Sequence, residues 1–229
     1  MSIVLVTGTG TDIGKTIGTA ALAAALREEG KEVHVVKPIQ TGFPGPNGGD
    51  LDTVAELTGI DNLHGFERYP EPMAPVAAAQ RAGMRLPEAT EIAEKIKLID
   101  GPNRVVLVEG AGGLLVRLGE DWALPELAAL LPGSQMVVVT RLDLGCLNEA
   151  ELTVEVARGR GVNVTALVGG SLPAEVDPII ETNLEELPRI TGVPLLGSVQ
   201  AGAGALDRQE FVAKATQWLP GVREWAAAL

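Results

Sequence analysis

The stretch Ile3-Val4-Leu5-Val6-Thr7-Gly8-Thr9-Gly10-Thr11-Asp12-Ile13-Gly14-Lys15-Thr16 carries the strongest structural signal in this chain. Its first four residues are apolar and predict a buried strand, and the glycines that follow predict a tight turn into a helix. Such a turn offers backbone N–H groups to an anion, and the Gly-Lys-Thr ending adds an ammonium and a hydroxyl. The stretch therefore predicts a phosphate-binding loop, in which Lys15 contacts the β- and γ-phosphates and Thr16 ligates Mg²⁺.

The spacing of this loop differs from the common pattern. Five residues separate Gly8 from Gly14, whereas about four is usual at this place. A glycine-rich turn that only caps a helix, with a lysine there by chance, would also fit the bare motif. The apolar run before the loop and the alanine-rich segment after it (residues 17–28) favour phosphate binding, because the motif requires a strand, a loop and a helix in this order.

Composition is typical of a globular α/β protein. The 229 residues fit a single domain (residues 1–229), and 46% of them are hydrophobic but only 3% aromatic. A core so rich in aliphatic side chains suits helices packed on a buried parallel sheet. The formal net charge of −12 argues against nucleic-acid or membrane partners, so the positive charge that holds a nucleotide must be local.

Cysteine content and the N-terminal residues bear on the cellular compartment. A single cysteine cannot form an internal disulfide, which fits a reducing environment. The apolar run at residues 3–6 is too short for a signal peptide or a membrane span. We therefore expect a cytoplasmic protein.

Short apolar runs alternate with helical patterns along the chain. This alternation predicts a doubly wound, mostly parallel sheet with helices on both faces, an α/β fold like that of P-loop NTPases. The segment 42–50 is rich in glycine and proline and is expected to form a surface loop. The predicted strands are Ile3–Thr7, Val33–Lys37, Arg104–Glu109, Gln135–Thr140, Asn163–Gly169 and Pro194–Val199. The predicted helices are Lys15–Glu29, Leu51–Thr58, Ala74–Ala82, Glu88–Ile99, Pro125–Leu131, Leu147–Arg160, Asp177–Leu187 and Arg208–Leu219.

Charged residues stand where two of the predicted strands end. Lys37 and Glu109 each close an apolar run, and the carboxyl ends of parallel strands meet at one edge of a sheet. Lys37 is expected beside the transferring phosphoryl group, the alternative being a solvated strand end. A buried carboxylate at Glu109 needs a partner, for which Mg²⁺ is the natural choice. Asp50 could be a helix cap, but it is also the expected second carboxylate ligand.

Four segments together resemble the dethiobiotin synthetase family. They are Gly8 to Thr16, Lys37-Pro38-x-Gln40-Thr41-Gly42, Pro72-x-Ala74-Pro75 and Val108-Glu109-Gly110-Ala111-Gly112-Gly113. Leu144-Gly145-Cys146-Leu147-Asn148 is similar to a further segment of that family, so the resemblance covers essentially the whole chain. It implies an ATP- and Mg²⁺-dependent ligase of biotin biosynthesis. The implied reaction closes a ureido ring from 7,8-diaminopelargonate and CO₂, through a carbamate and its mixed anhydride with phosphate.

The resemblance also implies roles for individual residues. Lys15 and Lys37 would be catalytic, and Thr16, Asp50 and Glu109 would bind Mg²⁺. Nucleotide binding is implied for Thr11, Asp12, Ile13, Gly14, Lys15, Thr16, Ile17, Asp50, Glu109, Gly110, Ala111, Gly112, Gly170, Ser171, Gln200, Ala201 and Gly202. Binding of the diamine substrate is implied for Lys37, Thr41, Gly110, Gly112, Gly145, Cys146, Leu147 and Asn148. In the family a neighbouring subunit contributes the helix that the last four open, so we expect a homodimer with sites at the subunit interface.

Two features suggest altered nucleotide binding. Asp12 places a carboxylate inside an anion-binding loop, which is expected to reduce nucleotide affinity. In the family that this chain resembles, the segment matching Gly169 to Pro173 often has an asparagine whose amide reads adenine. This chain has no side-chain amide there, so CTP or GTP is expected to serve as well as ATP. His34 and His64 have no partner pattern and are expected to be ordinary surface or boundary residues.

Two other kinds of protein remain open. Another amide-forming synthetase of this fold, such as a cobyrinate diamide synthase, usually carries a glutaminase domain, for which 229 residues leave no room. A switch ATPase of the chromosome-partitioning kind has an extra lysine early in its phosphate loop, where this chain has Thr9 and Gly10. Its DNA-binding members would also need a basic face.

Overall fold

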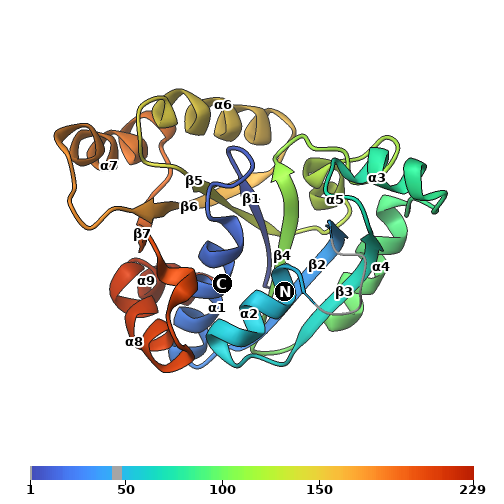
Figure 1. The fold of residues 1–229 in the computed structure, drawn as a ribbon, viewed down its shortest axis with the longest axis horizontal. Coiled ribbons are helices and arrows are strands. Elements are labelled where there is room, and N and C mark those ends of the chain that lie inside the picture. The colour runs from blue at the N-terminus through green and yellow to red at the C-terminus, as the bar shows by residue number, and fades with distance from the viewer. Residues whose placement is uncertain (1, 43–47) are drawn as a thin grey trace.

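A central parallel sheet organises the computed structural model, which describes residues 2–42 and 48–229 (Figure 1). Its seven strands lie in the order β3-β2-β4-β1-β5-β6-β7, and every neighbouring pair is parallel. The strands are β1 (Ile3–Gly8), β2 (Glu32–Thr41), β3 (Leu63–Tyr69), β4 (Arg104–Gly113), β5 (Gln135–Thr140), β6 (Asn163–Leu172) and β7 (Leu195–Gln200).

The helices connect these strands and cover both faces of the sheet (Figure 1). They are α1 (Lys15–Glu28), α2 (Asp50–Thr58), α3 (Pro75–Ala82), α4 (Ala89–Ile99), α5 (Leu124–Ala129), α6 (Cys146–Gly159), α7 (Pro178–Thr191), α8 (Arg208–Trp218) and α9 (Val222–Ala227), with a 3₁₀ turn, η1 (Ala203–Ala205). None of the described helices is both long and apolar enough to cross a lipid bilayer.

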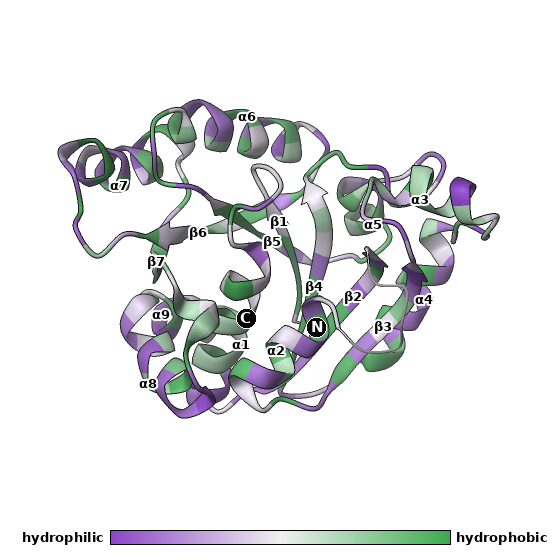
Figure 2. Cartoon of the chain, in the orientation of Figure 1, coloured by the Kyte–Doolittle hydropathy of each residue, from purple (hydrophilic) through white to green (hydrophobic). Residues whose placement is uncertain are grey.

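The central strand β1 shows how the two layers of the core arise. Successive side chains of a strand point to opposite faces of the sheet. Ile3 and Leu5 accordingly join the cluster under α3 to α7, whereas Val4 and Val6 join the cluster under α1, α2, α8 and α9. All four side chains are buried, which explains why the strand is apolar throughout rather than alternating. Figure 2 shows this apolar ribbon at the centre and hydrophilic residues on the outer helices.

The predicted fold class is confirmed. The six predicted strands and eight predicted helices are present; β5 has the predicted bounds, and the other elements differ at one or both ends. Strands β2, β4 and β6 continue to Thr41, Gly113 and Leu172. Strand β3, helix α9 and turn η1 were not predicted from the sequence. Strand β3 lies at the edge of the sheet, is mostly half-buried and carries charged residues, so it has no apolar run to reveal it. Of the loop expected at 42–50, residues 43–47 lie outside the described part of the chain.

The two histidines have partners that were not expected, and His34 is buried, whereas His64 is half-buried as a boundary residue would be. Nδ1 of His34 lies 3.0 Å from Nε2 of His64, and Nε2 of His34 lies 2.9 Å from a carboxylate oxygen of Glu32. Arg104 in turn donates to Glu32 at 3.0 Å. The pair forms because β3 lies beside β2 with His64 opposite Val36, and this unpredicted strand hid the partner.

Candidate active site

The phosphate loop leaves β1 at Gly8 and enters α1 at Lys15. Among the described residues, none accepts a hydrogen bond from the backbone N–H groups of residues 10–14. Gly14 adopts a φ of 85°, a left-handed conformation that a glycine allows at no steric cost. The loop therefore presents free N–H groups at a helix N-terminus, which suits an anion.

Asp12 holds an unusual backbone conformation within this loop. Its φ is 57°, in the region that asparagine and aspartate tolerate better than other non-glycine residues. Its side chain is exposed and borders two cavities, one on each side of the loop. The carboxylate thus stands at the mouth of the loop whose N–H groups would meet phosphate.

Strand register brings Lys37 and Glu109 together. Val36 of β2 pairs with Val108 of β4, so the next residue of each strand lies alongside the other. Nζ of Lys37 donates to Oε1 of Glu109 at 2.9 Å and to the carbonyl of Gly110 at 2.9 Å. Both side chains are almost fully buried, with exposed fractions of 4% and 1%. Lys37 is therefore not a solvated strand end.

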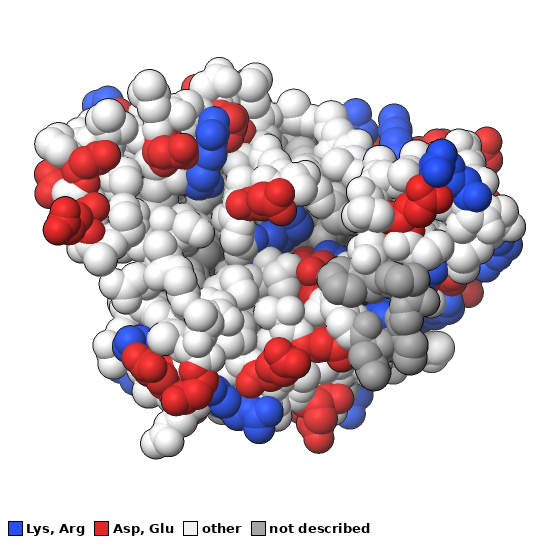
Figure 3. Space-filling view, in the orientation of Figure 1, with Lys and Arg blue, Asp and Glu red and all other residues white. Residues whose placement is uncertain are grey.

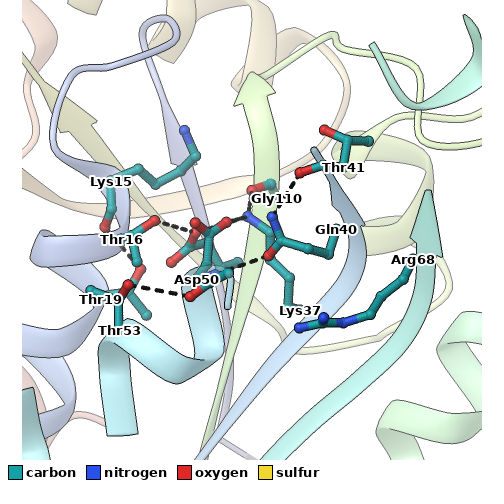
Figure 4. Close-up of polar contacts among 12 residues, drawn as sticks. Lys15, Thr16, Thr19, Lys37, Gln40, Thr41, Asp50, Thr53, Arg68 and Gly110 are labelled. Atoms are coloured by element: carbon teal, nitrogen blue, oxygen red, sulfur yellow. Dashed lines mark hydrogen bonds and ion pairs between the residues drawn. The ribbon is translucent and has the colours of Figure 1, made fainter. Parts of the chain in front are cut away.

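Asp50 reaches this pair from the first turn of α2. Its carboxylate is ion-paired with Lys37, and its backbone N–H donates to Oε1 of Gln40 at 3.0 Å (Figure 4). The Gln40 amide also donates to the carbonyl of Thr41 at 3.1 Å, which fixes the side chain at the end of β2. Gln40 thus positions Asp50. This role of Gln40 was not predicted from the sequence, although a polar residue near the end of an apolar strand was the available signal.

Opposing effects set the charge state of these groups. Burial would lower the pKa of Lys37, but the nearby Glu109 and Asp50 carboxylates outweigh it and hold that pKa above its ordinary value. Burial would likewise raise the pKa of Asp50, yet the Lys37 ammonium holds it below its ordinary value. Burial lowers the pKa of Lys15, and Glu109 offsets part of this effect. Figure 4 shows the Lys15 side chain extending away from Asp50, so its ammonium is separate from the buried pair.

The oxygen donors at this point fit a magnesium ion. Oε1 of Glu109 accepts from Thr16 Oγ1 at 2.9 Å, while Oε2 of Glu109 is buried without a hydrogen-bond partner in the described structure. In residues 2–42 and 48–229 no group of three or more His, Cys, Asp or Glu side chains forms a ready metal cage. Two carboxylates and a hydroxyl suit Mg²⁺, which keeps several water or phosphate ligands rather than filling its shell from protein.

Two cavities flank the phosphate loop, and Figure 3 shows charged side chains of both signs in the central hollow of this face. The first cavity, about 470 Å³, is lined by the three predicted metal ligands and by Lys15, but by three of the eight residues predicted for the diamine. Its lining includes Thr11, Asp12, Gly14, Lys15, Thr16, Ile17, Lys37, Thr41, Asp50, Glu109, Ala111 and Gly112. The second cavity, about 600 Å³, lies toward the ends of β5 and β6 and is bordered by Arg141, Gly170 and Ser171.

The end of β6 packs directly against the loop. A Cβ built on Gly170 would lie 2.1 Å from the carbonyl oxygen of Ile13, so only glycine allows this approach. The predicted base-side residues Gln200, Ala201 and Gly202 are exposed at the end of β7 and line neither of the two cavities in the described structure.

Among the described residues, the start of α6 does not line the cavity that contains Lys37. Gly145 caps the helix with a φ of 100°, and Cys146 is fully buried, as a packed rather than reactive cysteine would be. Of the residues lining the 470 Å³ cavity in the described structure, none comes from 145–148. The structure therefore does not join these four predicted residues to the rest of the site in a single chain.

A parallel sheet with a phosphate loop between β1 and α1 defines the P-loop NTPase fold. A family profile described as an AAA domain matches residues 3–204. The ATP-dependent dethiobiotin synthetase of Corynebacterium kroppenstedtii is 53% identical over 94% of this chain and 93% of that protein. The synthetase of Rhodococcus jostii is 46% identical over 95% and 94%. The chain belongs to the dethiobiotin synthetase family, a family of ATP-dependent ligases of biotin biosynthesis.

Solved structures agree with this fold. The cell division ATPase MinD of Pyrococcus furiosus has a TM-score of 0.63 at 18% identity, covering 100% of this chain and 99% of that one. A ParA family ATPase of Chlorobium tepidum has a TM-score of 0.58 at 14% identity, covering 99% and 97%. At this level of identity the likeness concerns the fold alone.

Proposed function

We propose that this chain makes dethiobiotin by closing a ureido ring on 7,8-diaminopelargonate with CO₂ and ATP in the 470 Å³ cavity. The observation that carries the proposal is the buried Lys37 ammonium among Asp50, Glu109 and Gly110, in the cavity that the phosphate loop also lines. Phosphoryl transfer to a carbamate requires positive charge at this point, because negative charge gathers on the transferring group.

The reaction has three steps. One amine of the substrate adds to CO₂ and loses a proton, which gives a carbamate. A carbamate oxygen then takes the γ-phosphoryl group of ATP and ADP leaves, so that a mixed anhydride forms. The second amine attacks the carbamate carbon, loses a proton and expels phosphate as the ring closes. Lys15 neutralises the β- and γ-phosphates and Lys37 the carbamate, so positioning and charge carry the catalysis and no covalent nucleophile is needed.

Thr16, Asp50 and Glu109 would hold Mg²⁺. The side chains of the cavity support this, because Lys15 and Lys37 face three carboxylates, Asp12, Asp50 and Glu109. That lining is net negative and would repel a polyphosphate without further positive charge. Bound Mg²⁺ would supply that charge at the β- and γ-phosphates.

Broad use of nucleoside triphosphates is the second part of the proposal. The end of β6 offers Ser171, whose hydroxyl both donates and accepts hydrogen bonds. Such a group does not distinguish adenine from cytosine or guanine. CTP and GTP are therefore expected to replace ATP.

A homodimer is the third part. Leu115, Leu144 and Leu152 are exposed by 45%, 78% and 55%, and a groove of about 400 Å³ runs between the end of β4 and α6. Exposed apolar patches of this kind commonly mark interfaces. A second copy on this face would bring its α6 N-terminus toward the first cavity, where the N–H groups could bind the substrate carboxylate. The net charge of −12 makes nucleic acid an unsuitable partner, and the single buried cysteine fits a cytoplasmic protein.

The experiment supplies the chain with diaminopelargonate, bicarbonate, Mg²⁺ and one nucleoside triphosphate at a time. We expect dethiobiotin by mass spectrometry with ATP, CTP and GTP, and nucleotide hydrolysis that depends on the diamine. Glu109→Gln should abolish product, whereas Lys214→Met, which breaks an exposed pair with Glu210 on α8, should not. Absence of product with every nucleotide would overturn the proposal, and a strict ATP requirement would overturn its second part.

A further inference from the structure

The Lys37 ammonium has no hydrogen-bonding capacity left for a substrate. An ammonium has three N–H donors. Here Lys37 pairs with the Asp50 carboxylate, with Oε1 of Glu109 and with the carbonyl of Gly110. With an exposed fraction of 4%, it also has almost no contact with solvent. In this arrangement it cannot stabilise a carbamate.

The same two carboxylates are the proposed metal ligands. Asp50 and Glu109 are both engaged by Lys37, and the Thr16 hydroxyl shares Oε1 of Glu109. A cation and the Lys37 ammonium compete for these oxygens, because two like charges a few ångströms apart in a buried site repel. Oε2 of Glu109 is buried without a hydrogen-bond partner among the described residues.

We propose that Lys37 is the internal counter-ion of Asp50 and Glu109 in the unliganded chain, and that pairing of these carboxylates with a divalent cation releases Lys37 for the carbamate. The inference rests on the proposed function, since it takes Thr16, Asp50 and Glu109 as the metal ligands. The Gly110 carbonyl does not belong to that ligand set, so its hydrogen bond can keep Lys37 at the end of β4 while the other two are lost.

Release of Lys37 couples two binding events. A cation that enters without nucleotide must displace a charge already in place, so the unliganded chain should bind it weakly. Once the cation is paired with Asp50 and Glu109, repulsion directs the Lys37 ammonium toward the incoming anion. Lys37 can therefore bind the carbamate only after the metal ion has bound. This order prevents Lys37 from binding substrate before the metal and nucleotide are in place.

The test measures Mn²⁺ binding to the full chain in the absence of nucleotide. Electron paramagnetic resonance of the free ion reports how much Mn²⁺ remains unbound. Removing one partner from a buried ion pair leaves an uncompensated charge, which is strongly unfavourable. Lys37→Met should therefore tighten Mn²⁺ binding by at least about tenfold. Lys214→Met makes the same change in net charge at an exposed pair and should leave the affinity unchanged.

Two results would overturn the inference. One is an unchanged Mn²⁺ affinity in Lys37→Met. The other is tightening that persists in the double variant Lys37→Met with Glu109→Gln, since the ion would then be bound elsewhere. A separate result would show that the proposed metal ligands are wrong. In that case Mn²⁺ would still bind in the presence of nucleotide to the single variant Glu109→Gln.

The wild-type chain gives an answer even where Lys37→Met does not fold. Lys37 should react slowly with a small amine-acylating reagent in the unliganded protein, because it is buried and ion-paired. Saturating Mg²⁺ and ADP, which leave the γ-phosphate position open, should increase its labelling several-fold relative to ADP with a chelator. Labelling at residue 37 that does not change would overturn the inference.

Discussion

Gly170 controls the phosphate loop through packing alone, and Gly170→Ala tests this. The new Cβ would lie 2.1 Å from the Ile13 carbonyl oxygen, whereas ordinary contact begins at 3.4 Å. The two groups must therefore separate by more than 1 Å, and neither can rotate away, because the Cβ is fixed to the backbone and the oxygen is a backbone atom. The carbonyl oxygen of Thr140 lies 3.6 Å from the same Cβ position, which limits movement of β6. The loop has to move instead.

We expect Gly170→Ala to impair nucleotide binding and catalysis more than it lowers stability. Overpacking of this kind destabilises a protein by roughly 1–3 kcal/mol, while displacement of reacting groups by about 1 Å can reduce a rate by around 10²-fold. We expect weaker nucleotide binding by calorimetry, a fall in kcat/KM of that order, and a lower thermal midpoint. Gly159→Ala is the matched control, because beyond its own helix turn no atom of the described residues lies within 4 Å of its Cβ position, and helix α6 accepts alanine. Wild-type nucleotide affinity in Gly170→Ala would refute the argument.

Three further predictions concern charge and assembly. Asp12→Gly should tighten nucleotide binding about fivefold, as measured by calorimetry. A carboxylate near phosphate costs on the order of 1 kcal/mol in water, and glycine adopts the φ of 57° without strain. Equal or weaker binding would contradict this prediction. Burial and the nearby His34 lower the pKa of His64 in the folded protein below its ordinary value of 6.5. Neutral His64 therefore stabilises the fold fully above pH 6.5. This stabilisation is lost as the pH falls from 6.5 through the pKa of the folded state. The thermal midpoint of the wild type should therefore fall more steeply with acid than that of His64→Gln, although Glu32 and Arg104 also face the pair; parallel curves would exclude this explanation. Leu152→Glu should convert a dimer into monomers, as measured by light scattering. Leu98→Glu, which changes an 84% exposed leucine on α4, should leave the dimer intact. A monomeric wild type would contradict the proposed interface.

The sequence by itself determined the class of fold, the loop and the chemical groups. Apolar runs such as residues 3–6 predict buried strands because a parallel sheet covered on both faces needs apolar side chains at every position. Lys37 and Glu109 were identifiable because charge at the end of an apolar strand is costly unless the site uses it. The family resemblance extended this set to the residues of nucleotide, metal and diamine binding, and all of these roles remain predictions.

Tertiary structure alone decided which of these groups touch one another. The Lys37–Glu109 pair depends on the register of β2 with β4, which joins residues 72 positions apart. Sequence periodicity assigns a side chain to a face but does not fix register between strands distant along the chain. The His34–His64 pair was missed for the same reason, since its second strand is an edge strand without an apolar signature. The pairing of Lys37 with the proposed metal ligands also depends on tertiary packing. It arises because β2, the end of β4 and the start of α2 meet in one buried place.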